Sequence, residues 1–442
     1  MEFQRQELRE FYIRHLKESI LSFWMPRCLD QEMGGYLNCY DNAGEHLMSK
    51  NKFIWSQGRF VWAFSKLAGT PADIFTAEER CTFLEYAAHG IDFLRKHAIL
   101  PDKFACTYLT DQAGTPIYSD GEQIYDASIY VDCFVIIGFA KYALVTGDEN
   151  CYDFAERLYR SVAERIEKKD YHVLPYARPE GRKMHGVPMI CLNTATELFQ
   201  AAKKLGKESE ALKTDISGYA SEILEHFCDR ENRIHEIVTE DNRFTDDLLG
   251  RHINPGHSIE DLWFLLDAAD ILGRKDWRRQ CFVILRRTLQ LGWDEEFGGI
   301  LLYVDQDGGR PRGGAAGFSE SENMVARLRN NWDSKLYWVH SESLYTTLRC
   351  FLADQGEDLW REYVRLHEYV FSAFPNPNRE IGEWIQVRKR DGSPDDKLVG
   401  LPVKDPFHIT RNLILTIELL SEPGETKRKL EDYAGTAEQR KK

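Results

Sequence analysis

The chain has 442 residues, of which 43% are hydrophobic and 12% aromatic, a composition typical of a well-filled globular core. Its formal net charge of −14 disfavours nucleic acids and anionic membrane surfaces as partners, so small neutral ligands are the natural candidates. We expect a cytoplasmic protein, because the N-terminus lacks the apolar stretch of a signal peptide and no later segment approaches the roughly 20 residues that span a bilayer. The ten cysteines are scattered singly, as expected of reduced core residues.

A hydrophobic period of 3.6 residues predicts helices along most of the chain. They begin near residues 5, 53, 76, 124, 149, 185, 208, 258, 274, 335, 357 and 407. Between alternate helices lie short β-prone pieces, each broken by a turn of Asp, Asn or Gly. These pieces lie near Gly34, Phe104, Tyr171, Arg233, Gly298 and Gly382.

Two of the β-prone pieces are near copies, since DQEMGGY from Asp30 is echoed by DEEFGGI from Asp294. Such self-similarity marks a repeat architecture, and a helix pair with a hairpin can bury its apolar faces only if the units stack or close into a ring. We therefore predict an all-α fold, an (α/α)6 barrel with short β-hairpins in the connecting loops. It forms one domain over residues 1–422, and residues 423–442 form a charged, disordered tail.

Three histidines stand at loop-to-helix junctions: His257 in PGHSIEDLWFLL, His340 in WVHSESLYTTL and His408 in PFHITRNLILTIELL. A helix start presents the positive end of the backbone dipole, which lowers the pKa of a nearby imidazole and keeps it neutral. Neutral imidazoles are good general bases near pH 7. If the inner helices are parallel and begin at the hairpin-bearing end, the three rings converge on one mouth.

Carboxylates and one cation accompany these histidines. Glu260 lies three residues after His257, where it could orient the imidazole, although a capped helix start is the structural alternative. Glu342 follows His340, for which we favour a sugar-binding role over that of a base. Arg411 lies one turn after His408.

Other side chains complete the predicted site. His185, at the start of the sixth predicted helix, is a weaker fourth candidate. Arg59 lies in an apolar helix, four residues after Trp55, and needs an internal ion pair or a substrate oxygen as its partner. Trp338 and Trp384 could stack on sugar faces. Compact metal-ligand spacings such as HExxH do not occur, so we predict neither a metal nor a cofactor. The stretch Gly308–Arg329, rich in Gly, Arg and Ser, is either a mobile lid over the mouth or a solvated loop.

The strings WSQGRFVW, NPGHSIEDLWFLL, KLYWVHSES, GEW and PFHITRNL, in this order, resemble the N-acylglucosamine 2-epimerase family of sugar epimerases and isomerases. The resemblance runs from about Asp30 to Leu420. It implies an (α/α)6 barrel that moves a proton at C2 of an open-chain sugar through an enediolate-like intermediate. The family habit also suggests a homodimer.

The resemblance assigns roles residue by residue. His257 and His408 match the acid/base pair, Arg59 the arginine that stabilises the oxyanion, and Glu260 the carboxylate beside the first histidine. The predicted substrate contacts are Trp55, Tyr108, His185, Asn193, Arg251, Trp338, His340, Glu342, Trp384 and Arg411.

The chain departs from the family where it has Tyr-Trp-Val-His in place of Trp-Trp-Pro-His at residues 337–340, and in the length of the insertion at Gly308–Arg329. We predict a 2-epimerase acting on N-acetylglucosamine/N-acetylmannosamine or glucose/mannose. The alternatives on the same fold are an aldose–ketose isomerase of the mannose/fructose type and a cellobiose 2-epimerase. Less favoured are a glycoside hydrolase using Glu260 and Asp126, and a binding protein without catalytic activity.

Overall fold

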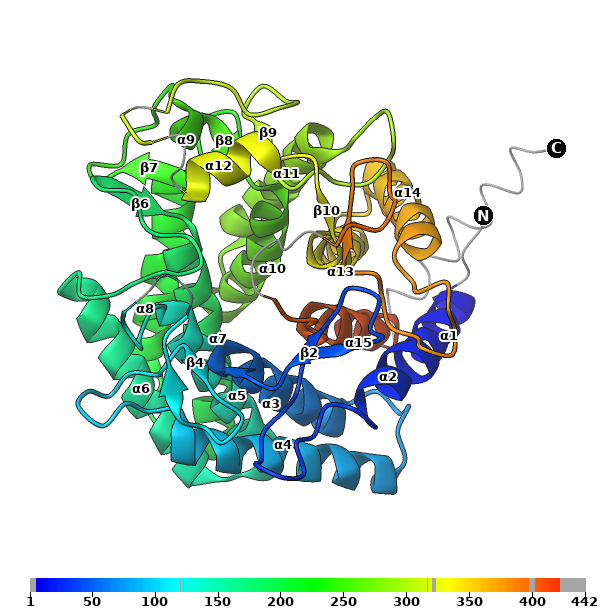
Figure 1. Ribbon diagram of the computed structural model, residues 1–442. Coiled ribbons are helices and arrows are strands. Elements are labelled where there is room, and N and C mark those ends of the chain that lie inside the picture. The colour runs from blue at the N-terminus through cyan, green and yellow to red at the C-terminus, as the bar shows by residue number, and fades with distance from the viewer. Residues whose placement is uncertain are drawn as a thin grey trace.

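The computed structural model describes residues 5–119, 121, 123–315, 317–319, 323–396 and 402–421. Six of its helices form an inner ring, in which each contacts the next and α15 contacts α3 (Figure 1). They are α3 (Ile54–Gly69), α5 (Ile129–Thr146), α7 (Gly186–Leu205), α10 (Pro255–Leu272), α13 (Tyr337–Asp354) and α15 (Phe407–Ser421). Most residues of these helices are buried on every face, because each packs between two inner neighbours and one outer helix.

An outer helix covers each inner one (Figure 1). The outer helices are α4 (Ala77–His97), α6 (Glu149–Glu167), α8 (Glu210–Glu222), α11 (Lys275–Gly292), α14 (Glu357–Ala373) and α1 (Arg5–His15), the last packed on α15. Shorter helical pieces are the π-helical segments at Leu16–Leu21 and Ile223–Phe227, α2 (Ser22–Trp24), α9 (Leu248–Arg251) and α12 (Asn323–Asn330). The predicted (α/α)6 barrel is confirmed.

The predicted helix starts agree with these bounds to within three residues except at one place. α5 begins at Ile129 and not near residue 124, because Ser128 is extended and pairs with Val173 in an isolated bridge. Tertiary pairing thus delays a helix that its hydrophobic pattern would start earlier.

Short strands link the repeats at one end of the ring. They are β1 (Cys39–Tyr40), β2 (Leu47–Ser49), β3 (Lys52–Phe53), β4 (Leu109–Thr110), β5 (Pro116–Ile117), β6 (Arg182–Met184), β7 (Ile237–Thr239), β8 (His252–Ile253), β9 (Val304–Asp305), β10 (Lys335–Leu336) and β11 (Val387–Arg388). The strand before an inner helix pairs antiparallel with a strand of the following unit in β3–β4, β6–β7, β8–β9 and β10–β11. The backbone N–H of Lys404 donates to the carbonyl of Asn38 (2.9 Å), which links the last unit to the first. The inner helices therefore all begin at the hairpin-bearing end, as predicted.

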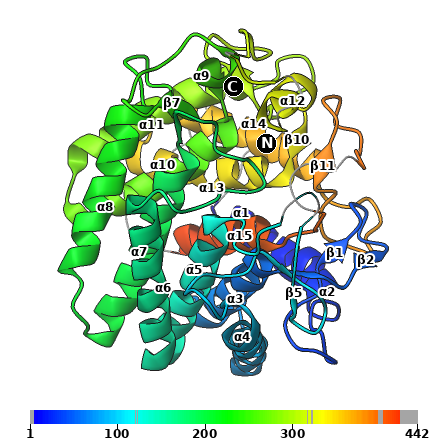
Figure 2. The same ribbon diagram turned by 60° about the vertical axis from the view of Figure 1, so that its left-hand side comes forward.

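Hairpins of neighbouring units also touch through side chains. Asn42, which follows β1, donates from Nδ2 to the carbonyl of Val387 in β11 (2.9 Å), and Figure 2 shows β1 and β2 close to β11. The hairpins at this end of the ring therefore contact one another.

Buried lysines explain the two near-copied segments. Lys52 donates from Nζ to Asp30 Oδ2 (2.8 Å) and to the carbonyl of Gly34 (2.6 Å). Lys335 lies 3.2 Å from Asp294 Oδ2 and donates to the carbonyl of Gly298. In both units the lysine precedes an inner helix, so the repeated Asp and Gly residues tie the preceding hairpin to the start of that helix.

Three predictions from the sequence concern a membrane-spanning segment, the cysteines and the C-terminal tail. Among the described residues one helix, α5, is long and apolar enough to cross a membrane, which differs from the sequence expectation; most of it is buried inside the protein, and it contacts α3, α6 and α7. All ten cysteines are unpaired, and all but Cys81 are buried. The predicted tail at 423–442 lies outside the described residues.

Candidate active site

A cavity of about 740 Å³ opens where the N-termini of the inner helices converge. Of the predicted site residues, the structure brings eight to its wall: Trp55, Arg59, Asn193, His257, Glu260, Trp338, His408 and Arg411. Their side chains come from α3, α7, α10, α13 and α15. The insertion also reaches this cavity, because Met324 of α12 lines it and Arg327 donates to the hydroxyl of Tyr176 (2.9 Å), which lines it too.

His257 is held by a carboxylate that the sequence analysis missed. Its Nδ1 lies 3.0 Å from Glu236 Oε2, and its backbone N–H is capped by Asn254 Oδ1 (3.2 Å). The side chain is 29% exposed, and its Nε2 has no hydrogen-bond partner among the described residues, so this nitrogen is available to a ligand. Burial by itself lowers the pKa of His257, but the charge and hydrogen bond of Glu236 raise it above its ordinary value.

His408 is held in the same way on the other side of the cavity. Its Nδ1 lies 2.7 Å from Glu342 Oε1, while its Nε2 lies 3.3 Å from Arg59 Nη2. Since the carboxylate accepts and the guanidinium of Arg59 donates, these two contacts favour the tautomer with its proton on Nδ1 and a lone pair on Nε2. Arg411 Nη2 also lies 3.2 Å from Nδ1. Arg59 is fixed in turn by Asp405, whose Oδ2 accepts from Nη1 (2.7 Å).

Trp338 lies on α13, which stands in the ring between α10, the helix of His257, and α15, the helix of His408. The centroid of its ring lies 5.3 Å from that of His257 and 5.7 Å from that of His408. The two bases thus flank one indole, with Arg59 beside the reactive nitrogen of the second. A ligand that rests against Trp338 would meet a nitrogen base from each side.

A buried cation holds the carboxylates beneath His408. Arg411 donates from Nη2 to both Glu260 Oε1 and Glu342 Oε1 (2.5 Å for Glu342), and it is only 1% exposed. Atoms of Glu260, Glu342 and His408 lie within 4.8 Å of one another, a spacing that metal ligands can have. The guanidinium of Arg411 already supplies the positive charge to both carboxylates, so this cluster is better described as an ion-pair network.

Glu260 does not have the partner that its spacing predicts. The three-residue offset pairs it with His257, but its side chain binds Arg411, and Glu236 binds His257 instead. Burial alone would raise the pKa of Glu236, but the charges and hydrogen bonds of His257 and His185 hold this pKa well below its usual range. The reason for the error is that a carboxylate on a neighbouring hairpin can approach a helix start as closely as one on the next turn.

Two predicted substrate contacts lie behind the cavity wall. Glu342 is fully buried, and it accepts hydrogen bonds from His408, Arg411, Asn412 and Trp263. Although burial raises the pKa of Glu342, Arg411 and His408 lower it to about 2. His185 is also fully buried, so both residues hold other side chains and do not contact a ligand.

Three more predicted contacts belong to the core. His340 accepts from the backbone N–H of Ile300 (2.9 Å) and donates to the carbonyl of Leu336 (2.7 Å), and burial lowers its pKa to about 3. Trp384 is fully buried and donates to His15 Nε2 (2.7 Å). Tyr108 is buried against Phe53. These residues do not line the cavity, so the sequence analysis was wrong to place them there.

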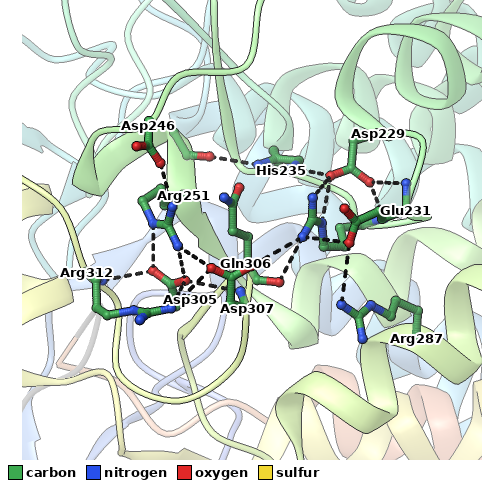
Figure 3. Close-up of polar contacts among 12 residues, drawn as sticks. Asp229, Glu231, His235, Asp246, Arg251, Arg287, Asp305, Gln306, Asp307 and Arg312 are labelled. Carbon is green, nitrogen blue, oxygen red and sulfur yellow. Dashed lines mark hydrogen bonds and ion pairs between the residues drawn. The ribbon is translucent and has the colours of Figure 1, made fainter.

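Arg251 is likewise not a cavity residue. Figure 3 shows its guanidinium between Asp246 and Asp305, with Arg312 of the insertion on the far side of Asp305. Arg251 Nη2 lies 2.6 Å from Asp305 Oδ1 and 2.7 Å from Asp307 Oδ2. The side chain therefore ties α9 to β9 and to the residues just before the insertion, and its guanidinium donors are taken up by these carboxylates.

Sequence reasoning missed Glu236 and Asp405. Glu236 lies within the β-prone piece RIHEIVTEDNRF and Asp405 in KDPFH, just before His408, so each was visible only as a charged residue in a connecting segment. Asp405 accepts at Oδ1 from the backbone N–H of Phe407 (2.8 Å), a capping arrangement that its place before a predicted helix could have suggested.

The glycine of the Asn-Pro-Gly-His segment is needed for close packing. A Cβ at Gly256 would lie 2.6 Å from Trp338 Cη2 and 2.7 Å from Val339 Cγ2. We expect Gly256→Ala to displace Trp338, lowering kcat at least tenfold and the free energy of unfolding by about 1–3 kcal/mol. Activity assays and urea unfolding measure the two effects.

Gly218→Ala is the matched control, because this glycine lies inside α8 with no atom within 4 Å of the added Cβ. It should leave activity unchanged and raise stability by about 0.5–1 kcal/mol. Equal behaviour of the two variants would contradict the proposed contact between Gly256 and Trp338.

The closed ring of six helix pairs, with the cavity of His257 and His408 at its hairpin-bearing end, places the protein in the class of (α/α)6 barrels. The model of the N-acylglucosamine 2-epimerase family matches residues 35–410. The chain therefore belongs to the N-acylglucosamine 2-epimerase family. It is a sugar 2-epimerase, an enzyme of the isomerase class.

Comparison with individual proteins gives the same family. The chain is 29% identical to the N-acylglucosamine 2-epimerase of Bos taurus, over 95% of this chain and 94% of that protein. It is 23% identical to a cellobiose 2-epimerase of Ruminococcus albus, over 89% and 94% of the two chains. Among solved structures, the cellobiose 2-epimerase from Bacillus thermoamylovorans B4167 superposes with a TM-score of 0.74 at 19% identity, over 93% of this chain and 99% of that one, which supports the fold.

Proposed function

We propose that this epimerase inverts C2 of an N-acylated hexosamine, the N-acetylglucosamine/N-acetylmannosamine pair, by proton transfer between two histidines and without a cofactor. The observation that carries the proposal is the arrangement of His257 and His408, each with a carboxylate on Nδ1, on either side of Trp338. Inversion at one carbon needs a base on one face and an acid on the other, and this arrangement offers both.

The chemistry follows from the two histidines and Arg59. One imidazole removes the proton from C2 of the open-chain sugar, and the electron pair of that bond moves into an enediolate-like intermediate whose negative charge lies on O1. Arg59, held by Asp405 beside His408 Nε2, supplies the positive charge that stabilises this oxygen. The other imidazole then returns a proton to the opposite face of C2, so the sugar gains and loses one proton.

The preference for an N-acyl sugar rests on α7. Asn193 lines the cavity, and its side-chain amide makes no hydrogen bond to the described residues, so it can pair with an acetamido group. Met189 and Ile190 of the same helix line the cavity beside it and suit an acyl methyl group. Glucose/mannose epimerisation, cellobiose 2-epimerisation and aldose–ketose isomerisation use the same two bases and remain the alternatives that the experiment below separates.

The cavity also suits an uncharged sugar. Its cations are engaged, Arg59 by Asp405, Arg411 by Glu260, and Lys404 by Glu383 (2.8 Å). A glycoside hydrolase is disfavoured, because Asp126 does not line the cavity and pairs with Lys103, while Glu260 is bound to Arg411.

The deciding experiment is NMR of N-acetylmannosamine, mannose and cellobiose incubated with the protein in D2O. We expect N-acetylglucosamine to appear from N-acetylmannosamine with deuterium at its C2. Exchange only with mannose or cellobiose would move the assignment to those sugars, and a ketose product would identify an isomerase. Failure to exchange the C2 proton of any of the sugars would refute the proposed chemistry.

A further inference from the structure

Behind His257 runs a buried chain of four titratable side chains. His185 Nε2 lies 2.9 Å from Asp261 Oδ2, and His185 Nδ1 lies 3.3 Å from Glu236 Oε1. The other oxygen of Glu236 binds His257 Nδ1 at 3.0 Å. His185 and Asp261 have no exposed side-chain surface, so this series of hydrogen bonds ends in the core.

The contacts of His185 require two protons. Each of its ring nitrogens faces a carboxyl oxygen. Burial raises the pKa of Asp261, and the hydrogen bond and charge of His185 oppose that shift. With both carboxylates ionised they can only accept, and the ring then supplies both protons as an imidazolium. Burial opposes this charge, but Asp261 and Glu236 raise the pKa of His185 to about 9. The positive charge of His185 then lies between the carboxylates of Asp261 and Glu236.

The arrangement repeats, in different residues, what holds the other base. Glu342 binds His408 Nδ1 and is fixed by the guanidinium of Arg411, a permanent cation. Glu236 binds His257 Nδ1 and is fixed by His185, a cation that can lose its proton. Each base is thus held by a carboxylate that a cation fixes in place. Of the two cations, only His185 can lose its proton.

We propose that His185 is a positioning residue, which bridges Asp261 and Glu236 and so fixes Glu236 on His257, the base of one half-reaction. The inference rests on the proposed function. Besides one another, these four side chains face the following titratable groups: Glu260 on α10, Cys281 on α11, His252 in β8, Tyr130 on α5, and Tyr303. The ring of Phe227 lies 5.7 Å from that of His185. A positive charge on His185 is therefore balanced by the carboxylates of Asp261 on α10 and of Glu236, just before β7.

His185→Gln tests the proposal, because glutamine has both N–H donors on one nitrogen and an acceptor oxygen beside it, so it cannot replace the two opposed donors of the ring. We expect kcat to fall on the order of 10–100-fold with KM nearly unchanged, as when a partner that orients a metal-bound histidine is removed. His367→Gln is the matched control: His367 is 5% exposed, lies on the outer helix α14 and contacts Tyr12 (3.1 Å). It should keep the wild-type kcat.

Proton exchange distinguishes a positioning role from simple destabilisation. If only His257 is impaired, His185→Gln in D2O should still exchange the C2 proton of one epimer through His408, but exchange the other epimer slowly. Equal loss with both epimers, or a kcat equal to that of His367→Gln, would overturn the inference. Failure of the wild-type protein to exchange either epimer would instead refute the proposed function.

The pH profile gives a second readout. His185 is protonated below its pKa of about 9, so the support is present at neutral pH and is lost as the pH rises through that value. Asp261→Asn removes one of the two anions that favour the imidazolium, so the alkaline limb of kcat should move to lower pH. An alkaline limb at the wild-type pH in Asp261→Asn would contradict the role of His185.

Discussion

His408→Asn should lower kcat for epimerisation by about 10³-fold or more, with KM changed by less than a few-fold. The lost group is a base, and positioned general acid–base groups contribute on the order of 10²–10⁴ in rate. Asparagine is close in size to the part of the imidazole that carries Nδ1, so the contact with Glu342 can persist. Steady-state kinetics with both epimers measure kcat and KM, and thermal unfolding shows whether the variant keeps its fold.

Comparison of the two histidines makes the test sharper. In D2O, His408→Asn and His257→Asn should each exchange the C2 proton of only one epimer, and of opposite epimers, because each variant keeps one base. His367→Asn serves as the control for loss of a buried histidine outside the site. A His408→Asn enzyme with the wild-type rate, or two variants that exchange the same epimer, would rule out the two-base mechanism.

Arg411→Met should lower the free energy of unfolding by about 3–5 kcal/mol, the usual cost of removing one partner from a buried ion pair. Arg411 is 1% exposed and donates to Glu260 and Glu342, which are 6% and 0% exposed, so its loss leaves two carboxylates without their cation in the core. Urea unfolding followed by circular dichroism measures the loss, and activity should fall with it, since Glu342 holds His408.

A second substitution tests whether charge is the cause. Adding Glu342→Gln to Arg411→Met removes one of the unpaired charges and should recover part of the lost stability. The control is Arg312→Met, whose side chain is 61% exposed and which should change stability by less than about 0.5 kcal/mol. A double variant no more stable than Arg411→Met would show that lost packing, and not unpaired charge, is responsible.

The architecture could be predicted because its signals are local. The 3.6-residue period and the repeated Asp-x-x-x-Gly-Gly segments report on burial of helix faces and on turns, and both depend on residues close in sequence. Since a helix pair cannot bury its apolar faces alone, counting the pairs was enough to predict a closed ring. The exception at α5 arose where Ser128 pairs with Val173, a contact outside the hydrophobic pattern.

The candidate site was predicted in part. Each of His257, His408 and Arg59 is marked in the sequence by a junction or by a charge inside an apolar helix, and the structure brings all three to one cavity. His340 carries the same junction signal but lies in the core with both nitrogens bound to the backbone. A helix start therefore identifies candidates without showing which way a side chain points.

The sequence by itself determined the ring, the common direction of the inner helices and the end at which their histidines gather, because helix period, turns and repeats are encoded locally. Only the tertiary structure decided which carboxylate serves which histidine. Glu260 is three residues from His257 yet binds Arg411, while Glu236 reaches His257 from the end of a hairpin. Electrostatic pairs form between side chains that are close in space, and a loop that is distant in the sequence can approach a helix start more closely than the next turn of the same helix does.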